Sequence, residues 1–196
     1  MCDARVLEAV AAVPRAEFAP AEHADRAYHD EPIPIPHGQV TTQPSLVARM
    51  LEALALRQSD RVLEVGTGYG FQTALLARLA GEVVSVERHA DLARTARRNL
   101  TRHGVTNAEV LVGDGSAGAP DRAPFDAIVV SAAFPRVPRP LADQLAEGGR
   151  LVQPLGPGGH DEVTLFERGG EGLERRHRVT PAHFVRLYGA HGFDPD

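Results

Sequence analysis

The sequence contains no lysine, no tryptophan and only one cysteine among its 196 residues. Its 21 basic residues are therefore all arginines, and together with 26 acidic residues they leave a formal net charge of -5. Such a balance gives no overall attraction to a phosphate backbone, so we expect no nucleic-acid partner. The single cysteine, Cys2, excludes an internal disulfide and a paired-thiol metal site, which is typical of a protein in a reducing cytoplasm.

Long apolar runs are also missing from the chain. No stretch approaches the roughly 20 apolar residues that span a bilayer, and the N-terminal MCDARVLEAV lacks the unbroken apolar core of a signal peptide. We therefore expect a cytoplasmic protein with no membrane partner. The short tail GFDPD offers little surface for a partner protein, so we expect a monomer.

The length of 196 residues predicts a single domain with one active site. Helical periodicity covers residues 3–13 and returns from Pro44, whereas residues 18–43 carry four prolines and must be largely extended. A loop of that length usually covers a site. We divide the chain into an N-terminal segment (1–57), a core (58–156) and a C-terminal part (157–196).

The core alternates short apolar runs with helical patterns, in the order RVLEV, FQTALLARLA, EVVSVE, ADLARTARRNLTRHG and AEVLVG. This alternation predicts βαβ units and a parallel sheet. FDAIVVSAA then predicts a buried strand, LADQLAEGG a helix that ends at Gly148 and Gly149, and RLVQPLG another strand. The tail predicts an antiparallel flank, with two strands in EVTLFERGGEGLERRHRVT and a last strand in HFVRLYG. The expected fold class is α/β, a Rossmann-like and mostly parallel seven-stranded sheet with helices on both faces.

A glycine-rich turn follows the first core strand in VLEVGTGYG, where Gly66, Gly68 and Gly70 let backbone amides approach a ligand. A dinucleotide fingerprint needs a small residue where this chain has Phe71, which disfavours an NAD-dependent oxidoreductase. The G-x-G-x-G spacing, with Glu64 two residues before it, is the pattern of S-adenosylmethionine enzymes. Because a nearby carboxylate stabilises the sulfonium and ammonium charges of that cofactor, the turn predicts a class I methyltransferase.

Two more carboxylates fall at the ends of the next two strands, where ligands of open α/β sheets bind. Glu87 ends VVSVE and can accept hydrogen bonds from both ribose hydroxyls of the cofactor. Asp114 follows EVLVG and is placed to reach the adenine edge. A glycine-rich turn alone can serve packing only, but three acidic residues at three successive strand ends favour a cofactor site.

The chain resembles the protein-L-isoaspartate O-methyltransferases in four blocks that follow in the right order: AYHDEPIPIPHGQVTTQPSLVARMLEAL, GDGSAGAPDRAPFDAIVVSAA, VPRPLADQLAEGGRLVQPLG and HFVRLYG. That family methylates the free α-carboxylate of isoaspartyl residues in peptides and proteins, and the ester then collapses through a succinimide towards normal aspartate. The resemblance implies that residues 1–57 form an acceptor-binding cap. A carboxylate acceptor needs positioning and desolvation more than a general base, which fits the absence of a Cys/His or Ser/His/Asp constellation.

The resemblance also implies the site residues. Thr42 takes the position of a catalytically important serine and keeps its hydroxyl. The expected substrate-binding residues are His37, Gly38, Val40 and Arg186. The expected cofactor-binding residues are Gln39, Val40, Thr41, Thr42, Glu64, Gly66, Thr67, Gly68, Tyr69, Gly70, Glu87, Arg88, Asp114 and Gly115. The histidines show no ligand spacing on a helix face, so we expect no metal.

Three departures from the family pattern leave alternatives open. Thr42 carries an extra methyl group, Ser116 stands where the family commonly has a large side chain, and Arg186 stands where the last strand commonly reads Val-Pro-Leu. Neutral drift explains each departure, but together they also fit a dedicated methyltransferase of an aspartate in one peptide, with Arg186 paired to a second substrate carboxylate. A small-molecule or RNA methyltransferase and a silent cofactor-binding protein are further alternatives.

Several other side chains have a structural explanation beside a functional one. His37 can contact substrate or stabilise its own turn, and Phe71 can flank the cofactor or begin the core of its helix. Two arginine sets resemble a nucleic-acid patch, but a solvated helix face and a hairpin edge guarded by charge explain them better. The two sets are Arg94, Arg98 and Arg102, and Arg175, Arg176 and Arg178.

Overall fold

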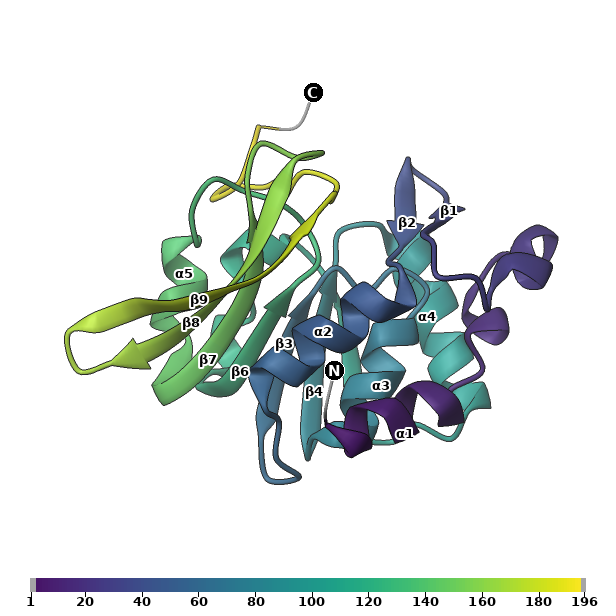
Figure 1. Cartoon of the computed structure of the whole chain (residues 1–196), viewed down its shortest axis with the longest axis horizontal. Coiled ribbons are helices and arrows are strands. Elements are labelled where there is room, and N and C mark those ends of the chain that lie inside the picture. The colour runs from purple at the N-terminus through teal and green to yellow at the C-terminus, as the bar shows by residue number, and fades with distance from the viewer. Residues whose placement is uncertain (1–2, 195–196) are drawn as a thin grey trace.

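Seven strands form one sheet in the computed structural model, which describes residues 3–194 (Figure 1). Their order is β5-β4-β3-β6-β7-β8-β9; the first five are parallel, and β8 and β9 each run antiparallel to the preceding strand. This confirms the predicted α/β class with an antiparallel C-terminal flank. The strands are β3 (Arg61–Val65), β4 (Glu82–Glu87), β5 (Ala108–Val112), β6 (Phe125–Val130), β7 (Leu145–Leu155), β8 (Asp161–Gly169) and β9 (Gly172–Ala182).

Apolar side chains on both faces of the sheet pack against helices. Because side chains alternate along a strand, Val62 and Val83 belong to one buried cluster, and Leu63 and Val84 to the other. The first cluster includes residues of α1 to α4, and the second includes α5 and the C-terminal segment around Leu187. No helix within residues 3–194 is long and apolar enough to cross a membrane. The helices are α1 (Ala4–Ala12), α2 (Pro44–Leu54), α3 (Phe71–Leu79), α4 (Ala90–Arg102) and α5 (Arg139–Asp143).

The N-terminal segment joins α1 to α2 through short turns and a small hairpin. The predicted helices at residues 3–13 and from Pro44 are confirmed, and residues 18–43 form no α-helix. Extended chain before α2 forms the two-stranded sheet of β1 and β2, which places the acceptor-like sequence HGQVTTQP at its turn and second strand. These elements are η1 (Arg15–Phe18), η2 (Ala21–Arg26), β1 (Ile33–Ile35) and β2 (Gln39–Thr41), with η marking 3-10 turns.

The predicted helix in LADQLAEGG is wrong beyond Asp143. Helix α5 ends there, and β7 begins at Leu145, where it pairs with Phe125 of β6. Arg168 on β8 donates to three backbone carbonyls within residues 142–145. A side chain from another strand therefore satisfies oxygens at this helix end, and the sequence of the helix alone does not reveal that contact.

The predicted last strand, HFVRLYG, is also wrong, because this segment forms only isolated bridges. It meets the chain beyond β6 where Ala133 pairs with Arg186. The carboxylate of Asp161 accepts the backbone N–H of Phe184 at 3.0 Å, which fixes the point where the chain leaves the sheet. The segment then runs along the ends of the parallel strands instead of extending the sheet.

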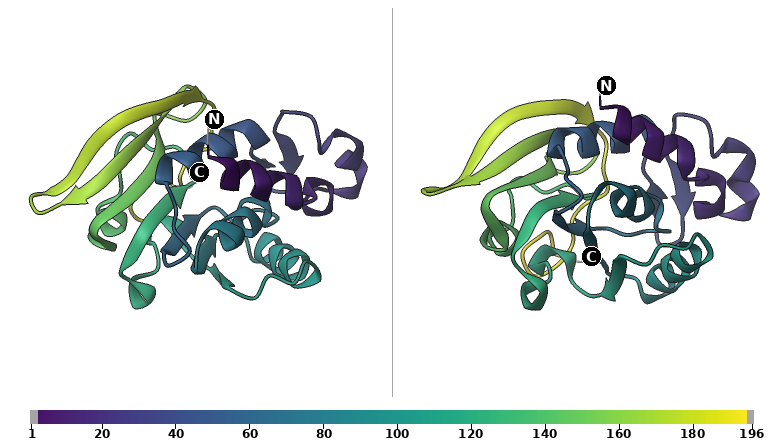
Figure 2. Two further views of the ribbon diagram at one scale, coloured as in Figure 1. Left: turned by 60° about the horizontal axis from the view of Figure 1, so that its bottom comes forward. Right: turned by 90° about the horizontal axis from the view of Figure 1, so that it is seen from below.

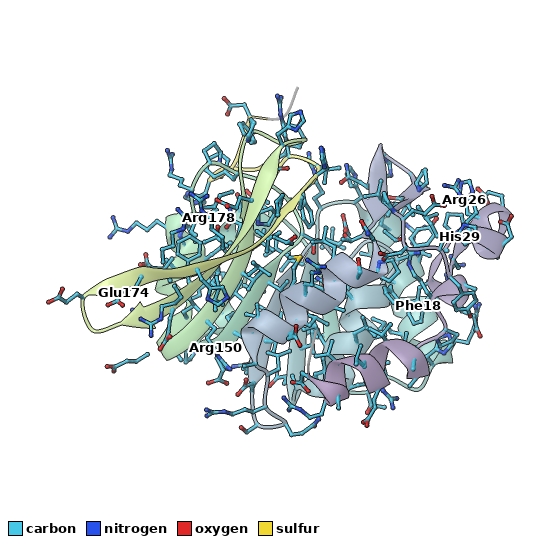
Figure 3. The ribbon with its side chains drawn as sticks, viewed as in Figure 1. Phe18, Arg26, His29, Arg150, Glu174 and Arg178 are labelled. Atoms are coloured by element: carbon cyan, nitrogen blue, oxygen red, sulfur yellow. The ribbon has the colours of Figure 1, made fainter. Side chains whose placement is uncertain are left out.

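The β8–β9 hairpin projects from the rest of the sheet (Figure 2). Its charged side chains, including Glu174 and Arg178, point outward along the ribbon (Figure 3). The arginines of β9 pair with glutamates, so this arginine set forms a charged hairpin surface with its own acidic partners. The pairs are Arg175–Glu162 at 3.1 Å, Arg176–Glu167 at 3.0 Å and Arg178–Glu162 at 3.0 Å.

Candidate functional site

The glycine-rich loop after β3 lies at the carboxyl ends of the parallel strands. Gly66, Gly68 and Gly70 have φ values of 97°, 56° and 91°, a region that other residues rarely adopt. The backbone N–H of Gly68 donates to Oε2 of Glu87 at the end of β4, at 2.9 Å. The loop therefore presents bare backbone beside a carboxylate.

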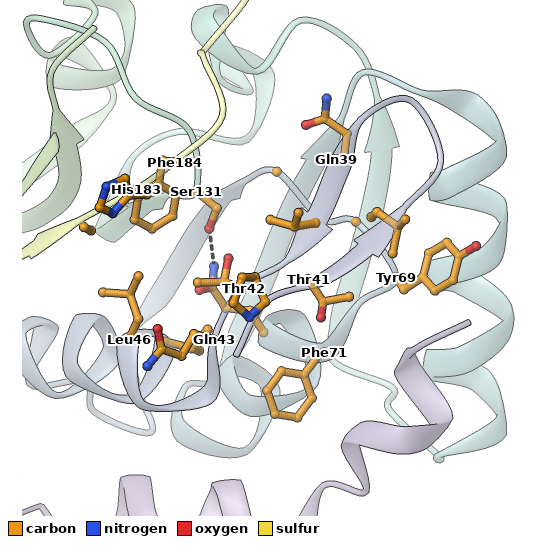
Figure 4. A pocket seen from close by; sticks show the side chains of 18 of the residues that line it. Gln39, Thr41, Thr42, Gln43, Leu46, Tyr69, Phe71, Ser131, His183 and Phe184 are labelled. Carbon is orange, nitrogen blue, oxygen red and sulfur yellow. Dashed lines mark hydrogen bonds between the residues drawn. The ribbon is translucent and has the colours of Figure 1, made fainter. Parts of the chain in front are cut away.

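A cavity of about 550 Å³ lies between this loop, the β1–β2 hairpin, α2 and the end of β9 (Figure 4). Its size is typical of small-molecule sites. The cavity brings the acceptor-like segment and the glycine-rich loop together, although they are separated in sequence by α2 and β3. The sequence-predicted residues that line it are Gln39, Val40, Thr41, Thr42, Gly66, Thr67, Gly68, Tyr69 and Glu87.

The remaining sequence-predicted residues lie outside the cavity lining. They are His37, Gly38, Glu64, Gly70, Arg88, Asp114, Gly115 and Arg186. The glycines among them shape turns: Gly38 has a φ of 65° in the hairpin turn, and Gly70 begins α3. Gly115 allows a close approach, because a Cβ there would lie 2.5 Å from Cγ1 of Val65.

Glu64 is fully buried, and the protein's own side chains satisfy its carboxylate. The hydroxyls of Thr73 and Ser85 donate to Oε2 at 2.5 and 2.6 Å, and the amide of Gln72 donates to Oε1 at 3.0 Å. Burial raises the pKa of Glu64 to about 7, although these three hydrogen bonds oppose the rise. Ser85 Oγ also lies 2.5 Å from Oγ1 of Thr67, so this carboxylate network ties the glycine-rich loop to β3, β4 and α3.

Glu87 is the carboxylate that lines the cavity. It is buried at the end of β4, and the loop and the start of α4 hold both of its oxygens. Oε2 accepts from the N–H of Gly68 at 2.9 Å, and Oε1 accepts from the N–H of His89 at 3.0 Å. A carboxylate accepts about four hydrogen bonds, so Glu87 retains capacity for two donors from a bound molecule.

Asp114, after β5, is covered by the C-terminal segment. Its Oδ1 accepts from the backbone and the hydroxyl of Ser116 at 2.9 and 2.6 Å, and its Oδ2 accepts from the N–H of Ala190 at 2.7 Å. The pKa of Asp114 is lowered overall: burial acts to raise it, but these hydrogen bonds act together against burial and outweigh it. Because Ser116 Oγ also accepts the N–H of His191 at 3.0 Å, a large side chain in place of Ser116 would displace this segment.

His37 joins the β1–β2 hairpin to the start of α4. Its ring stacks on His89 with 4.1 Å between centroids, and its Nε2 lies 2.9 Å from Oδ2 of Asp91. Burial lowers the pKa of His89, and the neighbouring His37 lowers it further. The Arg88 guanidinium lies 5.2 Å from the ring centroid of Tyr188. The contacts of His37 hold the β1–β2 hairpin, and that of Arg88 holds the C-terminal segment, near the end of β4.

Arg186 makes its contacts away from the cavity. Its Nε donates to the carbonyl of Pro157 at 2.9 Å, and its guanidinium lies 5.2 Å from the ring centroid of Phe193. These contacts hold the C-terminal segment to the loop after β7. The structure therefore does not bring Arg186 together with Thr42.

Several lining residues were not singled out by the sequence analysis. Ser131 follows β6, and its Oγ accepts from the Gln72 amide at 3.0 Å, the dashed contact in Figure 4. The strand-end argument that selected Glu87 would also have found Ser131, because SAA follows the apolar run FDAIVV. Arg49 of α2 and residues 180–184, at and just beyond the end of β9, line the cavity too. Arg49, His183 and Phe184 lie in blocks that resemble the family, but no residue pattern marked them as site residues.

The sheet order and the glycine-rich loop at the ends of its central strands define a class I methyltransferase fold. A solved protein-L-isoaspartate O-methyltransferase structure has a TM-score of 0.85 and 29% sequence identity, with 97% of this chain and 63% of that chain covered. This chain thus spans under two thirds of that structure's length. A Plasmodium falciparum protein described as a protein-L-isoaspartate O-methyltransferase, in complex with S-adenosyl-L-homocysteine, has the same fold, with a TM-score of 0.82, 24% identity and coverage of 96% and 92%.

Sequence comparison identifies the family within that class. The family model for protein-L-isoaspartate(D-aspartate) O-methyltransferase matches residues 1–192. The protein-L-isoaspartate O-methyltransferase of Methanoculleus marisnigri is 56% identical over 192 residues, covering 97% of this chain and 86% of that protein. That of Koribacter versatilis is 48% identical over 193 residues, covering 98% and 86%. The chain belongs to the protein-L-isoaspartate(D-aspartate) O-methyltransferase family.

Proposed function

We propose that this chain transfers a methyl group from S-adenosylmethionine to the free α-carboxylate of L-isoaspartyl residues in damaged proteins and peptides. The methyl ester then collapses through a succinimide, which can reopen as normal aspartate. The observation that carries the proposal is a cavity lined by both the acceptor-like HGQVTTQP segment and the glycine-rich loop, in a chain whose family match covers residues 1–192. The formal net charge of -5 supports the absence of a nucleic-acid partner. We also propose that the enzyme acts in the cytoplasm and as a monomer.

The residues on the core side of the cavity fit S-adenosylmethionine. When bound, this cofactor supplies a methyl group on a positively charged sulfur, which a carboxylate oxygen can attack in line. Glu87 lines the cavity and would accept hydrogen bonds from both ribose hydroxyls, and the bare backbone of Gly66 and Gly68 would allow the cofactor to approach closely. Asp114 and the C-terminal segment that covers this carboxylate would lie beside the adenine edge of the cofactor. In this arrangement residues 58–156 form the cofactor core.

We propose that the N-terminal segment (1–57) is the acceptor cap, and that the C-terminal part (157–196) contributes residues 180–184 to the cavity lining. Thr41 is buried and Thr42 half-buried in the cavity wall, opposite Ser131 and Phe184 (Figure 4). Hydroxyls in this position can donate to the acceptor carboxylate and fix its direction of attack. The apolar side chains of Ile35, Leu46 and others exclude water, which strengthens these hydrogen bonds.

The alternative of one dedicated peptide substrate loses support from two of the three departures. Ser116 has a role in holding the C-terminal segment, and Arg186 is engaged with Pro157 and Phe193. Neither residue lines the cavity. We therefore retain the repair reaction as the proposed function.

Methyl transfer to matched peptides tests the proposal. With labelled S-adenosylmethionine, we expect base-labile labelling of an isoaspartyl peptide and none of its aspartyl or asparaginyl counterparts. Isothermal titration calorimetry measures cofactor binding separately, and it therefore distinguishes an enzyme from a protein that binds the cofactor without turnover. If the protein binds the cofactor but transfers no methyl group to the isoaspartyl peptide, the repair reaction is rejected. The alternatives are then a methyltransferase of one dedicated peptide and a protein that only binds the cofactor.

Substitutions at Thr42 should separate its hydroxyl from its shape. Thr42→Val removes the hydroxyl at nearly constant volume, and we expect kcat/KM for the isoaspartyl peptide to fall by about tenfold to a hundredfold, the cost of one hydrogen bond to a charged group. Thr42→Ser keeps the hydroxyl and should retain activity within about threefold. Steady-state kinetics measure both. Equal losses in the two variants would show that packing, and not the hydroxyl, matters at this position.

A further inference from the structure

A buried arginine lies directly behind the part of the cavity wall that Thr41 and Thr42 form. Arg15, the first residue of η1, is 2% exposed. We propose that Arg15 is a positioning residue of the acceptor site, which holds Thr41 and Thr42 in place without contacting the substrate. This inference rests on the proposed function, because it assigns the acceptor side of the same site.

The guanidinium of Arg15 joins two stretches of the N-terminal segment. Nη1 donates to the carbonyls of Ala27 and His29, at 2.9 and 3.3 Å. Nη2 donates to the carbonyl of Glu31 at 2.9 Å, to Oγ1 of Thr41 at 3.0 Å and to the carbonyl of Thr42 at 3.1 Å. One rigid planar group therefore connects the chain before β1 to the end of β2.

The partners of Arg15 distinguish it from an ordinary stabilising ion pair. Its hydrogen bonds among the described residues all go to carbonyl or hydroxyl oxygens, with the ring of Phe71 centred 5.8 Å from the guanidinium carbon. Burial lowers the pKa of Arg15, while the charges of Asp30 and Glu31 oppose this. A buried charge is tolerated only where hydrogen bonds compensate it, so the acceptor segment must keep its carbonyls pointed at this side chain.

Thr41 is the link from Arg15 to the cavity. Its Oγ1 accepts a hydrogen bond from the guanidinium, which leaves the hydroxyl proton available to donate to another group. Thr41 lines the cavity, and the adjacent positive charge makes its hydroxyl a stronger donor towards a carboxylate. The bond to the carbonyl of Thr42 fixes the backbone that carries the neighbouring hydroxyl.

Arg15→Lys tests this role, because lysine keeps the charge and the apolar stem but has no planar fork. We expect the acceptor KM to rise and kcat to fall, each by about tenfold, as misplacement of an acceptor predicts. The dissociation constant of the cofactor should rise by less than the acceptor KM, because the hydrogen bonds of Arg15 among the described residues go to the cap and none goes to Glu87 or the glycine-rich loop. Thr41→Val should lower kcat/KM in the wild type but add less than about threefold in the Arg15→Lys background, because coupled residues are not additive.

Hydrogen exchange supplies a readout that needs no substrate. In Arg15→Lys, amides of residues 27–31 and 39–43 should exchange at least about tenfold faster, while those of β3 stay unchanged. The matched control is Arg150→Lys, which alters a partly buried arginine that donates to the carbonyls of Leu54 and Ala55, away from the cavity lining. This control should leave the acceptor kinetics and the exchange of residues 39–43 as in the wild type.

Two results would overturn the positioning role. One is unchanged exchange of residues 39–43 in Arg15→Lys. The other is a parallel loss of cofactor affinity and stability in both lysine variants, which would indicate general destabilisation. Wild-type protein that fails to methylate the isoaspartyl peptide, while the exchange result holds, would reject only the proposed reaction.

Discussion

Replacing Glu87 with alanine should weaken binding of S-adenosyl-L-homocysteine by at least about a hundredfold, because the loss of two hydrogen bonds costs about 3 kcal/mol or more. Each hydrogen bond from a ribose hydroxyl to a carboxylate is worth about 1.5–3 kcal/mol, and two such bonds are lost. The variant also releases the N–H groups of Gly68 and His89, which the carboxylate now holds at 2.9 and 3.0 Å. Isothermal titration calorimetry measures the dissociation constant directly.

Glu82 provides the matched control for this prediction, because it begins the same strand that Glu87 ends. Its carboxylate is exposed and pairs with Arg61 at 3.1 Å, outside the cavity lining. Glu82→Ala should leave the dissociation constant within about twofold, since an exposed ion pair contributes little. A Glu87→Ala variant that binds within about threefold of the wild type would remove Glu87 from the cofactor site.

Stability should fall between pH 4.5 and pH 7.5 through the titration of Glu64. Its pKa is raised from 4.5 to about 7 in the folded protein, chiefly by burial. A raised pKa means that folding favours the protonated carboxyl. The contribution is therefore fully present below the unfolded pKa and is lost as the pH rises through about 7. At about 1.4 kcal/mol for each pKa unit, the loss is on the order of 3 kcal/mol.

The Glu64→Gln variant isolates this effect. Glutamine cannot titrate, so the difference in unfolding free energy between variant and wild type should shift by about 3 kcal/mol in favour of the variant as the pH rises from 4.5 to 7.5. Any constant cost from rearranged hydrogen bonds to Thr73, Ser85 and Gln72 cancels in this comparison. Denaturant unfolding at a series of pH values measures it. A difference that does not change with pH would show that folding leaves the pKa of Glu64 at its unfolded value, which contradicts the raised pKa.

The sequence predicted the parallel core well because its signals are local. Apolar runs such as RVLEV and EVVSVE, followed by helical periodicity, correspond to β3, β4 and the helices after them. The two wrong elements depend on distant partners. Arg168 of β8 caps the end of α5, and Asp161 binds the backbone N–H of Phe184, where the chain leaves the sheet. The residue pattern of either segment alone does not reveal these contacts.

The candidate site could be predicted only in part, for a related reason. The glycine pattern and the strand-end rule located the loop and Glu87, which the structure places in one cavity. The strand-end rule does not reveal whether a carboxylate already accepts hydrogen bonds from the protein itself. Glu64 meets hydroxyls from α3 and β4, and Asp114 meets the C-terminal segment. Those partners come from other elements, so only the folded structure reveals them.

The hydroxyl network around Glu64 also determines when the glycine-rich loop becomes ordered. Thr67 in the loop lies 2.5 Å from Ser85, which in turn donates to the buried carboxylate, and Gln72 joins that carboxylate to Ser131. Hydrogen bonds within the protein therefore hold the loop together with the sheet, and they need no ligand. The less conformational freedom the loop retains before a cofactor binds, the less entropy binding costs.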